Sequence, residues 1–550
     1  MVFVVVRISI VLALELVVAI GASAQNAPQP PQIHVSTHLV QIGVIVRDKN
    51  GAVADLTKED FGIFDRGKPQ KIGVFTVESS GATAWQAEPL PPSTFSNLAK
   101  YNPAAPGSIT IVLLDNLNTL SGSAPTIFED TPYWTEDHAL ANAKAHLLEY
   151  LRNLHPQDRV ALYGLSETLH VLCDFTTDRS RLISIVERYD ASSRTSREIV
   201  EPGATRLPGR PPDDPKTPPS FDRGNVEMAS SANASRAATT LAALNAIADH
   251  VANIPGRKNL VWLTANLPFS AETMAAILGP AQIAAYPVDS RGLLPRSNPI
   301  GSGGMDSAQP GLPDQIGGVF NDPNRQDEPT GIETVQRLAE LTGGRAFVNG
   351  NDLTRAIRDA VDDASILYTL GFYIDAHSAD DKFHELRVTA NRTGVTVRYP
   401  KAYFARKDTP ATQDERHNSF LTAIRSPLYA SAIPLQIQVD RVDHPTANSL
   451  ALSGAIGIHD IPLVQSGEIH TGALDITVIE QDGTGKVLRE SANRINLRFS
   501  EKQYPAILKS GVTFRKSLEP KAGATTLRIL VQDPGTAAIG SVIIPLSQVK

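Results

Sequence analysis

The sequence predicts a multidomain protein of the α/β plus all-β class, in which a central doubly wound, Rossmann-like α/β domain lies between an N-terminal β module and a C-terminal β-sandwich. Three observations lead to this prediction. The 550 residues are enough for roughly three or four domains of ordinary size. The middle of the chain alternates continuous apolar runs with amphipathic helical patterns, as parallel sheets covered by helices do. Both flanks alternate apolar and polar residues, as half-buried strands do.

The first residues have the pattern of an export signal. Residues 2–20 are mostly apolar, and the small residues Ala22 and Ala24 fit the A-x-A rule for cleavage. Glu15 would be costly in a permanent membrane helix, so we expect residues 1–24 to be a cleaved signal peptide, with an uncleaved anchor as the alternative. No second apolar run is long enough to span a bilayer. We therefore expect a secreted, periplasmic or cell-envelope protein without a membrane span after cleavage.

The pattern of residues 25–106 predicts an unfolded leading segment, a β module and a linker, in that order. Residues 25–32 are polar and Pro-rich and should hold no fold. Residues 33–78 alternate like strands and carry turn sequences at 48–51 and 66–68, so we expect a small β module there. Residues 79–106 are rich in Pro, Ala and Ser, which is typical of a linker.

Residues 107–405 are assigned to the α/β domain. The first strand, ITIVLLD at 109–115, is apolar almost throughout, as in sheets buried on both faces. Strands and helices then alternate, with one helix expected at 238–254. Two insertions, 190–235 and 295–330, lack periodicity and are too long for ordinary connections. The second follows a strand and should leave the carboxyl edge of the sheet, where open α/β folds bind ligands. The insertions either cover that edge, carry the binding surface, or are tolerated without a role.

The end of the chain returns to β patterns. Residues 365–405 contain three strand-like runs, which we include in the α/β domain. Residues 406–432 predict a short helical link. Residues 433–550 contain about six strand patterns separated by turns, which favours a β-sandwich.

Composition and charge exclude several classes of function. The chain has 51 Lys and Arg against 58 Asp and Glu, a net charge of −7. Broad binding to nucleic acid requires a basic face, so we expect no nucleic-acid partner. Cys173 is the sole cysteine, which excludes an internal disulfide, a four-cysteine zinc site and a CxxC redox pair. The sequence holds no P-loop, no H-E-x-x-H and no complete G-x-S-x-G motif, so we assign no catalytic and no cofactor-binding residue.

One loop at a strand end has features of a cation site. Asp115, Leu117 and Thr119 follow the first strand of the α/β domain at alternate positions. A hard divalent cation requires oxygen ligands on one tight loop, and alternate residues of an extended turn project to the same side. Asp115 and Thr119 meet this requirement, whereas Leu117 has no oxygen. Asn118 has one and could turn inward, but it lies at the wrong parity for that side. The alternative is a polar loop that caps the next helix.

Short motifs follow one another along residues 33–405. They are DF at 60–61, DRGKPQ at 65–70, VLLD at 112–115, NT at 118–119, DRVA at 158–161, DFT at 174–176, PGRKNLVW at 255–262, YPVD at 286–289 and TGGRA at 342–346. Each is weak alone, but in this order they resemble secreted bacterial proteins with a von Willebrand factor A-related (VWFA-related) domain. This resemblance implies a von Willebrand factor A (VWA) fold for the central domain, export and a binding role, and it implies no enzymatic activity.

The resemblance also implies a metal-ion-dependent adhesion site, which in VWA domains uses a D-x-S-x-S loop. Asp115 and Thr119 would keep its first and last ligands. The threonine that VWA domains add before a helix would be Thr240 or its neighbour Thr239. Ala265 stands where a further carboxylate would lie. Because cation affinity follows the charge of the ligands, we expect a degenerate site at Asp115, Thr119 and Thr240 that holds Mg²⁺ or Mn²⁺ weakly if at all.

Three hypotheses for the function follow. We favour an exported, non-enzymatic protein of adhesion type, whose VWA-like domain presents its carboxyl edge to a protein or glycan partner. The second is a hydrolase that uses Asp115 and Asp289, which ends another strand at the same edge, in one cleft. In the favoured hypothesis Asp289 would instead supply a substitute carboxylate for a cation. The third is a structural component of the cell envelope.

Overall fold

The computed structural model describes the chain in a series of ranges. They are 37–79, 88–101, 109–118, 136–154, 158–189, 219–254, 256–264, 267, 269–289, 331–348, 358, 366–375, 378–407, 409–444 and 447–549. The predicted signal peptide at 1–24, the lead at 25–32 and the insertion at 295–330 lie outside these ranges. Within them, no helix is long and apolar enough to cross a membrane.

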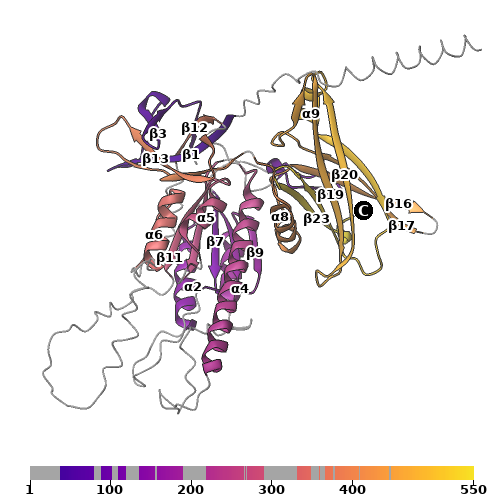
Figure 1. The fold of residues 1–550 in the computed structure, drawn as a ribbon. Coiled ribbons are helices and arrows are strands. Elements are labelled where there is room, and N and C mark those ends of the chain that lie inside the picture. The colour runs from indigo at the N-terminus through magenta and orange to yellow at the C-terminus, as the bar shows by residue number, and fades with distance from the viewer. Residues whose placement is uncertain are drawn as a thin grey trace, which may run out of the picture.

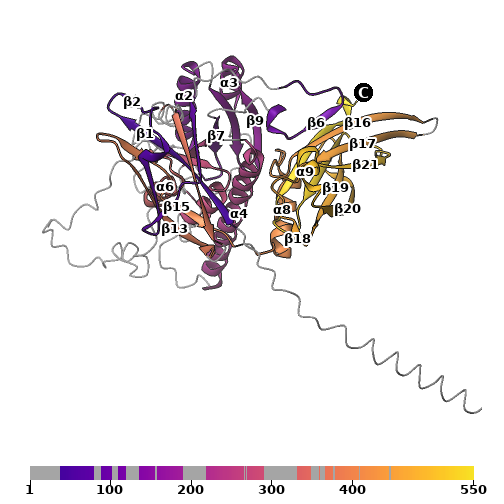
Figure 2. The same ribbon diagram turned by 90° about the horizontal axis from the view of Figure 1, so that it is seen from above.

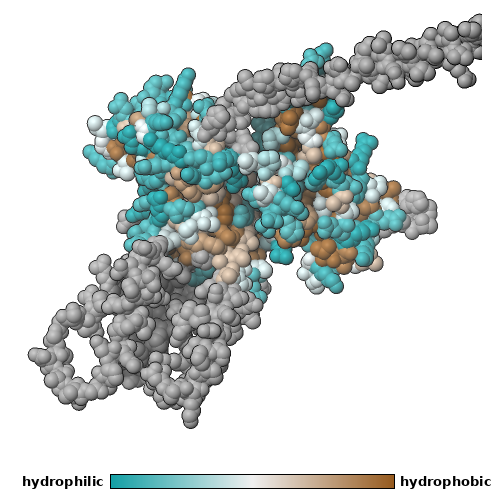
Figure 3. All heavy atoms as spheres, in the orientation of Figure 1, coloured by the Kyte–Doolittle hydropathy of each residue, from teal (hydrophilic) through white to brown (hydrophobic). Residues whose placement is uncertain are grey.

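The described residues form three folded parts (Figure 1). A β module sits on one end of a domain of helices and mostly parallel strands, and a large β-sandwich lies beside that domain (Figure 2). Hydrophilic residues cover most of the β module in the view of Figure 3, while more hydrophobic residues gather on the α/β domain below it.

The β module consists of two small sheets packed around one core. The first sheet has the order β14-β1-β12-β5, with β2 pairing to β1. Its strands are β14 (Thr396–Arg398), β1 (Thr37–Asp48), β12 (Ile366–Asp375), β5 (Val74–Ser79) and β2 (Gly51–Ala52). The second has the order β15-β13-β3-β4. Its strands are β15 (Ala402–Ala405), β13 (Lys382–Ala390), β3 (Phe61–Asp65) and β4 (Lys68–Gln70).

This arrangement corrects the predicted domain boundaries. We expected a module at 33–78 and an α/β domain that runs to residue 405. Instead β12 lies between β1 and β5, and β13 pairs with β3. Tyr368 and Phe372 of β12 are fully buried in the same core as Val44 and Ile63. Residues 366–405 therefore complete the N-terminal module, because the strands of 37–79 alone would leave their apolar faces and backbone groups without partners.

The α/β domain is built on one five-stranded sheet with the order β11-β10-β7-β8-β9. Its strands are β11 (Ile283–Asp289), β10 (Lys258–Thr264), β7 (Ile109–Asp115), β8 (Arg159–Leu165) and β9 (Leu169–Thr176). The first four are parallel, and β9 forms an antiparallel hairpin with β8. Strand β7 lies between β8 and β10, so Asp115 ends the middle strand.

Helices cover both faces of this sheet. On one face lie α4 (Pro219–Val251), α5 (Ala271–Leu278) and α6 (Gly331–Thr342); on the other lie α2 (Glu136–Arg152) and α3 (Arg179–Arg188). Leu113 of β7 faces the first group of helices, and its neighbours Val112 and Leu114 face the second. All seven residues of β7 are buried, so apolar side chains are required on both sides and the strand reads as a continuous apolar run.

Helix α4 begins earlier than predicted. We assigned 190–235 to an unfolded insertion and expected helix only from 238, but α4 starts at Pro219. Its first half, PSFDRGNVEMASSANASR, has no apolar stripe of helical spacing, so the periodicity that indicates a helix is missing there. Proline at the first position of a helix is well tolerated, because its missing N–H would have had no partner. Residues 190–218 lie outside the described ranges.

The predicted linker at 79–106 also contains structure. Within it, β6 (Thr94–Ser96) pairs antiparallel with β16 (Leu435–His444) of the C-terminal sandwich. The Asn97 amide donates to the carbonyls of Ala430 and Ile433 at 2.8 and 2.9 Å, and its oxygen accepts from the Leu435 N–H at 2.6 Å. The chain is thus fixed to the sandwich before it enters the α/β domain.

The C-terminal sandwich packs two sheets around one apolar core. The first sheet has the order β21-β17-β16-β6. It contains β17 (Ala447–Ile456) and β21 (Val512–Leu518) in addition to β16 and β6. The second, β18-β19-β22-β23 with β20 on β19, consists of β18 (Val464–Ser466), β19 (Ile469–Gln481), β20 (Val487–Ser500), β22 (Thr526–Gln532) and β23 (Ile539–Pro545). The helix α8 (Gln413–Arg425) lies in the predicted link at 406–432, and the buried Arg528 of β22 donates to the Ser426 carbonyl beyond it at 2.7 Å.

Candidate functional site

Asp115 is a carboxyl group held inside the protein. It ends β7 at the carboxyl edge of the parallel sheet, and it is 2% exposed. Burial raises its pKa above the ordinary value, while hydrogen bonds from Asn118, Trp262 and Thr264 act in the opposite direction. A buried carboxyl group is stable only with such donors.

Donors from three segments of the chain converge on Asp115. The backbone N–H of Asn118 donates to Oδ1 at 2.9 Å, and its side-chain amide donates to Oδ2 at 2.8 Å. The indole N–H of Trp262, from β10, donates to the same Oδ2 at 2.9 Å. Thr264, at the end of β10, also hydrogen-bonds the carboxyl group. Because a carboxylate offers about four acceptor positions, this set leaves little capacity for another ligand.

Thr240 joins the cluster from helix α4. Its side chain is fully buried, and its hydroxyl donates to the Arg236 carbonyl one turn earlier at 2.9 Å. The oxygen of Thr240 can therefore only accept, and it accepts from the Asn118 amide nitrogen at 2.9 Å. This requirement fixes the orientation of the amide, with NH₂ toward Thr240 and Asp115. Asn118 thus bridges the two residues that the sequence proposed as ligands.

The structure therefore brings together two of the three predicted site residues, Asp115 and Thr240. Thr119 lies outside the described residues. The sequence left open an inward turn of Asn118 against its parity, and the inward turn is what the structure has, since residues 116–118 form a turn and alternation does not apply there. Its position three residues after an aspartate, where side-chain-to-backbone bonds form turns, was the available signal.

The arrangement does not fit a bound divalent cation. A cation at this edge would require acceptor oxygens directed at it, but the group between Asp115 and Thr240 is the donor amide of Asn118. Among the described residues, no cluster of three or more His, Cys, Asp or Glu side chains is arranged to hold a metal. Among the described residues of this edge, the Asn118 amide thus directs its N–H groups at both Asp115 and Thr240.

Asp289 lies at the same edge but not beside Asp115. In the sheet register Asp289 is opposite Thr264, and Leu114 is opposite Leu263. Strand β10 thus separates the two aspartates, and neighbouring strands lie about 4.8 Å apart, so their backbones are roughly 10 Å apart. Thr264 lies between them and is bonded to Asp115. The two carboxyl groups therefore do not share a proton in the manner of a catalytic pair.

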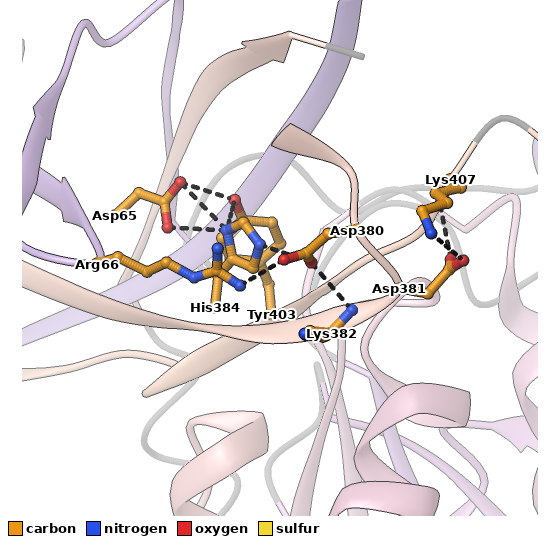
Figure 4. A network of polar contacts seen from close by, with 8 residues as sticks. All are labelled: Asp65, Arg66, Asp380, Asp381, Lys382, His384, Tyr403 and Lys407. Carbon is orange, nitrogen blue, oxygen red and sulfur yellow. Dashed lines mark hydrogen bonds and ion pairs between the residues drawn. The ribbon is translucent and has the colours of Figure 1, made fainter. Parts of the chain in front are cut away.

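Two further polar clusters lie outside this edge. In the α/β domain, burial alone would raise the pKa of Asp174. A hydrogen bond from His250 and the charge of that residue together outweigh this effect, so the pKa of Asp174 lies below its ordinary value. In the β module, the buried His384 lies between two carboxyl groups, with Nδ1 3.1 Å from Asp65 and Nε2 3.0 Å from Asp380 (Figure 4). Tyr403 donates to Asp65 at 3.1 Å. The first cluster joins helix α4 to strand β9, and the second joins strands β3, β13 and β15 of one sheet, so both have a structural role.

Comparison with known proteins adds little. No protein-family model and no curated protein matches the chain. Among solved structures, an aerotolerance-related membrane protein from Bacteroides fragilis is 13% identical with a TM-score of 0.24, covering 47% of this chain and 99% of its own. BatB, a conserved hypothetical protein from Bacteroides thetaiotaomicron, has the same identity and coverage and a TM-score of 0.25. Proximal thread matrix protein 1 from the mussel byssus is 9% identical with a TM-score of 0.24, covering 48% of each chain. These scores are too low to support an argument about fold or function.

Proposed function

We propose that this chain is an exported, non-enzymatic binding protein whose central domain is VWA-like and binds a protein or glycan partner at the carboxyl edge of its sheet without a cation. The observation that carries the proposal is the bridge of the Asn118 amide between Asp115 and Thr240. It replaces the positive charge of an ion with two internal hydrogen bonds. The predicted signal peptide supports export, and the mostly parallel sheet with helices on both faces supports the VWA-like domain.

The hydrolase hypothesis has less support. A general acid and base must both reach the reacting group, but β10 separates Asp115 from Asp289 and the donors around Asp115 occupy its oxygens. The structural-component hypothesis shares every feature of the binding proposal except the partner. Binding and a purely structural role are therefore separated by experiment rather than by geometry.

The test measures binding of the full mature chain to a glycan array and to cross-linked envelope proteins, with Mg²⁺ and with EDTA. The turn between β8 and β9 lies beside Asp115, since Asn116 donates to the Leu165 carbonyl at 2.9 Å. Glu167 in that turn is exposed. The variant Glu167→Lys should weaken binding by about fivefold, equivalent to ~1 kcal/mol. The exposed Glu490→Lys on β20 of the sandwich is the matched control and should change nothing.

The expected result is binding that EDTA leaves unchanged and that Glu167→Lys alone reduces. Binding that disappears with EDTA and returns with Mg²⁺ or Mn²⁺ would contradict the cation-independent edge. Chemical conversion of a captured ligand that Asp115→Asn abolishes would favour the hydrolase instead. No partner on either platform would favour the structural role.

A further inference from the structure

A cavity lies at the opposite edge of the parallel sheet, where the β module contacts the α/β domain. Its volume is about 270 Å³, near the lower end for small-molecule pockets. The residues that line it come from β1, the end of α5, the start of β11 and the strands β13 and β15. The cavity is therefore built from both parts of the molecule and is remote from Asp115, since β10 runs from one edge to the other.

Arg257 lines this cavity and is incompletely bonded. Arg257 stands directly before β10 and is 4% exposed. Its Nη2 donates to the Tyr286 hydroxyl at 3.1 Å and to the carbonyl of Gly343. Gly343 adopts a φ of 74°, in the left-handed region that favours glycine, and this turn directs its carbonyl to the guanidinium. The buried Nε–H has no acceptor, and both hydrogen bonds of the guanidinium to described residues come from Nη2, which leaves Nη1 for a ligand.

The charge of Arg257 is met only by neutral groups among the described residues, and one of them is the Tyr286 ring, whose centroid lies 6.0 Å from the guanidinium carbon. Both of its acceptors are neutral oxygens, and among the described residues it forms no ion pair. The neighbouring Lys258 is 2% exposed, and the carboxylate of Glu78 attracts its ammonium group. Glu78 thus acts on Lys258, and no carboxylate of the described residues is paired with Arg257. A buried guanidinium is stable when an anion neutralises it and accepts from a free N–H group, and a carboxylate that accepts from Nη1 does both.

The rest of the lining is largely apolar. Ala275, Ile283 and Phe383 belong to it, while Gln41 and Gln282 lie at its exposed rim, hydrogen-bonded to each other at 3.0 Å. A ligand in this space needs a small hydrophobic body in addition to its charged end, because inorganic anions would leave the apolar wall uncovered.

We propose that the cavity between the β module and the α/β domain binds a small organic carboxylate, with its carboxylate on the Arg257 guanidinium and its apolar body against Ala275, Ile283 and Phe383. The site is independent of the proposed partner edge. It is a junction site, so the bound molecule contacts residues of both folded parts and stabilises their contact.

The test uses the full mature chain, with benzoate and hexanoate as probes, benzamide as the neutral control and inorganic phosphate as the control for charge alone. Isothermal titration calorimetry and thermal unfolding are the measurements. We expect at least one carboxylate to bind saturably and to raise the melting temperature, while benzamide and phosphate do neither. Equal binding of benzoate and benzamide, binding of phosphate alone, or no binding of either carboxylate would overturn the proposal.

Two variants locate the site. Arg257→Gln removes the charge and should abolish binding of the carboxylate. Gln41→Trp fills the exposed rim without touching the core, so it tests the cavity even if Arg257→Gln fails to fold, and it should weaken binding at least tenfold. Gln438→Trp, on an exposed position of β16 in the sandwich, is the matched control and should bind as the wild type does. Unchanged binding in Gln41→Trp would place the ligand elsewhere and refute the inference.

Discussion

The Asn118→Ala variant tests the bridge at the end of β7. The substitution removes the side-chain amide but leaves the backbone N–H that donates to Asp115 Oδ1. Two hydrogen bonds disappear, one to Asp115 Oδ2 at 2.8 Å and one to Thr240 Oγ1 at 2.9 Å. Asp115 keeps Trp262 and Thr264 as donors. Its carboxyl group is thus left partly unsatisfied in a buried position.

The cost follows from these two bonds. A hydrogen bond to a charged group contributes about 1.5–3 kcal/mol and a neutral one about 1 kcal/mol, so the α/β domain should lose roughly 2–4 kcal/mol. The loss should be smaller at low pH. The pKa of Asp115 is already raised by burial, and removing a donor raises it further, so the variant folds best where Asp115 is protonated and loses stability as pH rises through its folded pKa.

Hydrogen–deuterium exchange of β7 and β10 peptides is the assay, because a multidomain chain need not unfold in one step. A loss of 2–4 kcal/mol corresponds to exchange that is roughly 30- to 700-fold faster. The control is Asn153→Ala, which removes one exposed bond to the Glu149 carbonyl in the same domain and should stay within about threefold. Exchange that Asn118→Ala accelerates less than about threefold would refute the bridge.

Three further predictions concern charge. Asn118→Asp restores an acceptor beside Asp115, so millimolar Mg²⁺ should raise the melting temperature of this variant by several degrees and that of the wild type by less than about one degree. Scanning fluorimetry measures both shifts. Equal shifts would argue against the idea that the Asn118 amide stands in for a cation. A hydrogen bond from Arg66 lowers the pKa of Asp380 to about 2. The stability difference between wild type and Arg66→Ala, followed by circular dichroism, should therefore shrink as pH falls from about 4 to about 2. A difference that stays constant over this range would contradict the prediction. Burial lowers the pKa of Lys258 to about 7, so the unfolded chain binds the extra proton between about pH 7 and 10 and native stability should rise across that window. Lys258→Met should abolish the rise in urea titrations, and a persisting rise would assign it to another group.

Much of the central domain could be predicted from the sequence. The strand ITIVLLD is apolar because helices cover both of its faces, and that burial is what a continuous apolar run records. The position of Asp115 at the end of this strand followed directly. The inward turn of Asn118 was left open but not favoured, because an alternation rule assumes an extended backbone and the chain turns after Asp115.

The partners of the flanking strands could not be predicted in this way. Alternation identifies a strand at 366–373 but carries no information about which strand lies beside it. Strand β6 was missed because three residues in a Pro-rich segment give no periodic signal, and its pairing with β16 depends on Asn97 and the edge of a sheet far along the chain. The first half of α4 was missed because its sequence has no apolar stripe.

The β module has a consequence for how the protein is made. The Tyr368 hydroxyl accepts from the Leu56 N–H, a pair 312 positions apart, and Ser79 of β5 pairs with Ile366 of β12. The polypeptide leaves and re-enters this module at neighbouring points, so the α/β domain is an insertion within it. During synthesis or translocation β1 and β5 emerge long before β12 and expose unpaired edges, which are prone to aggregation. Such a chain depends on a holding chaperone, or on folding after its release, to complete its first domain.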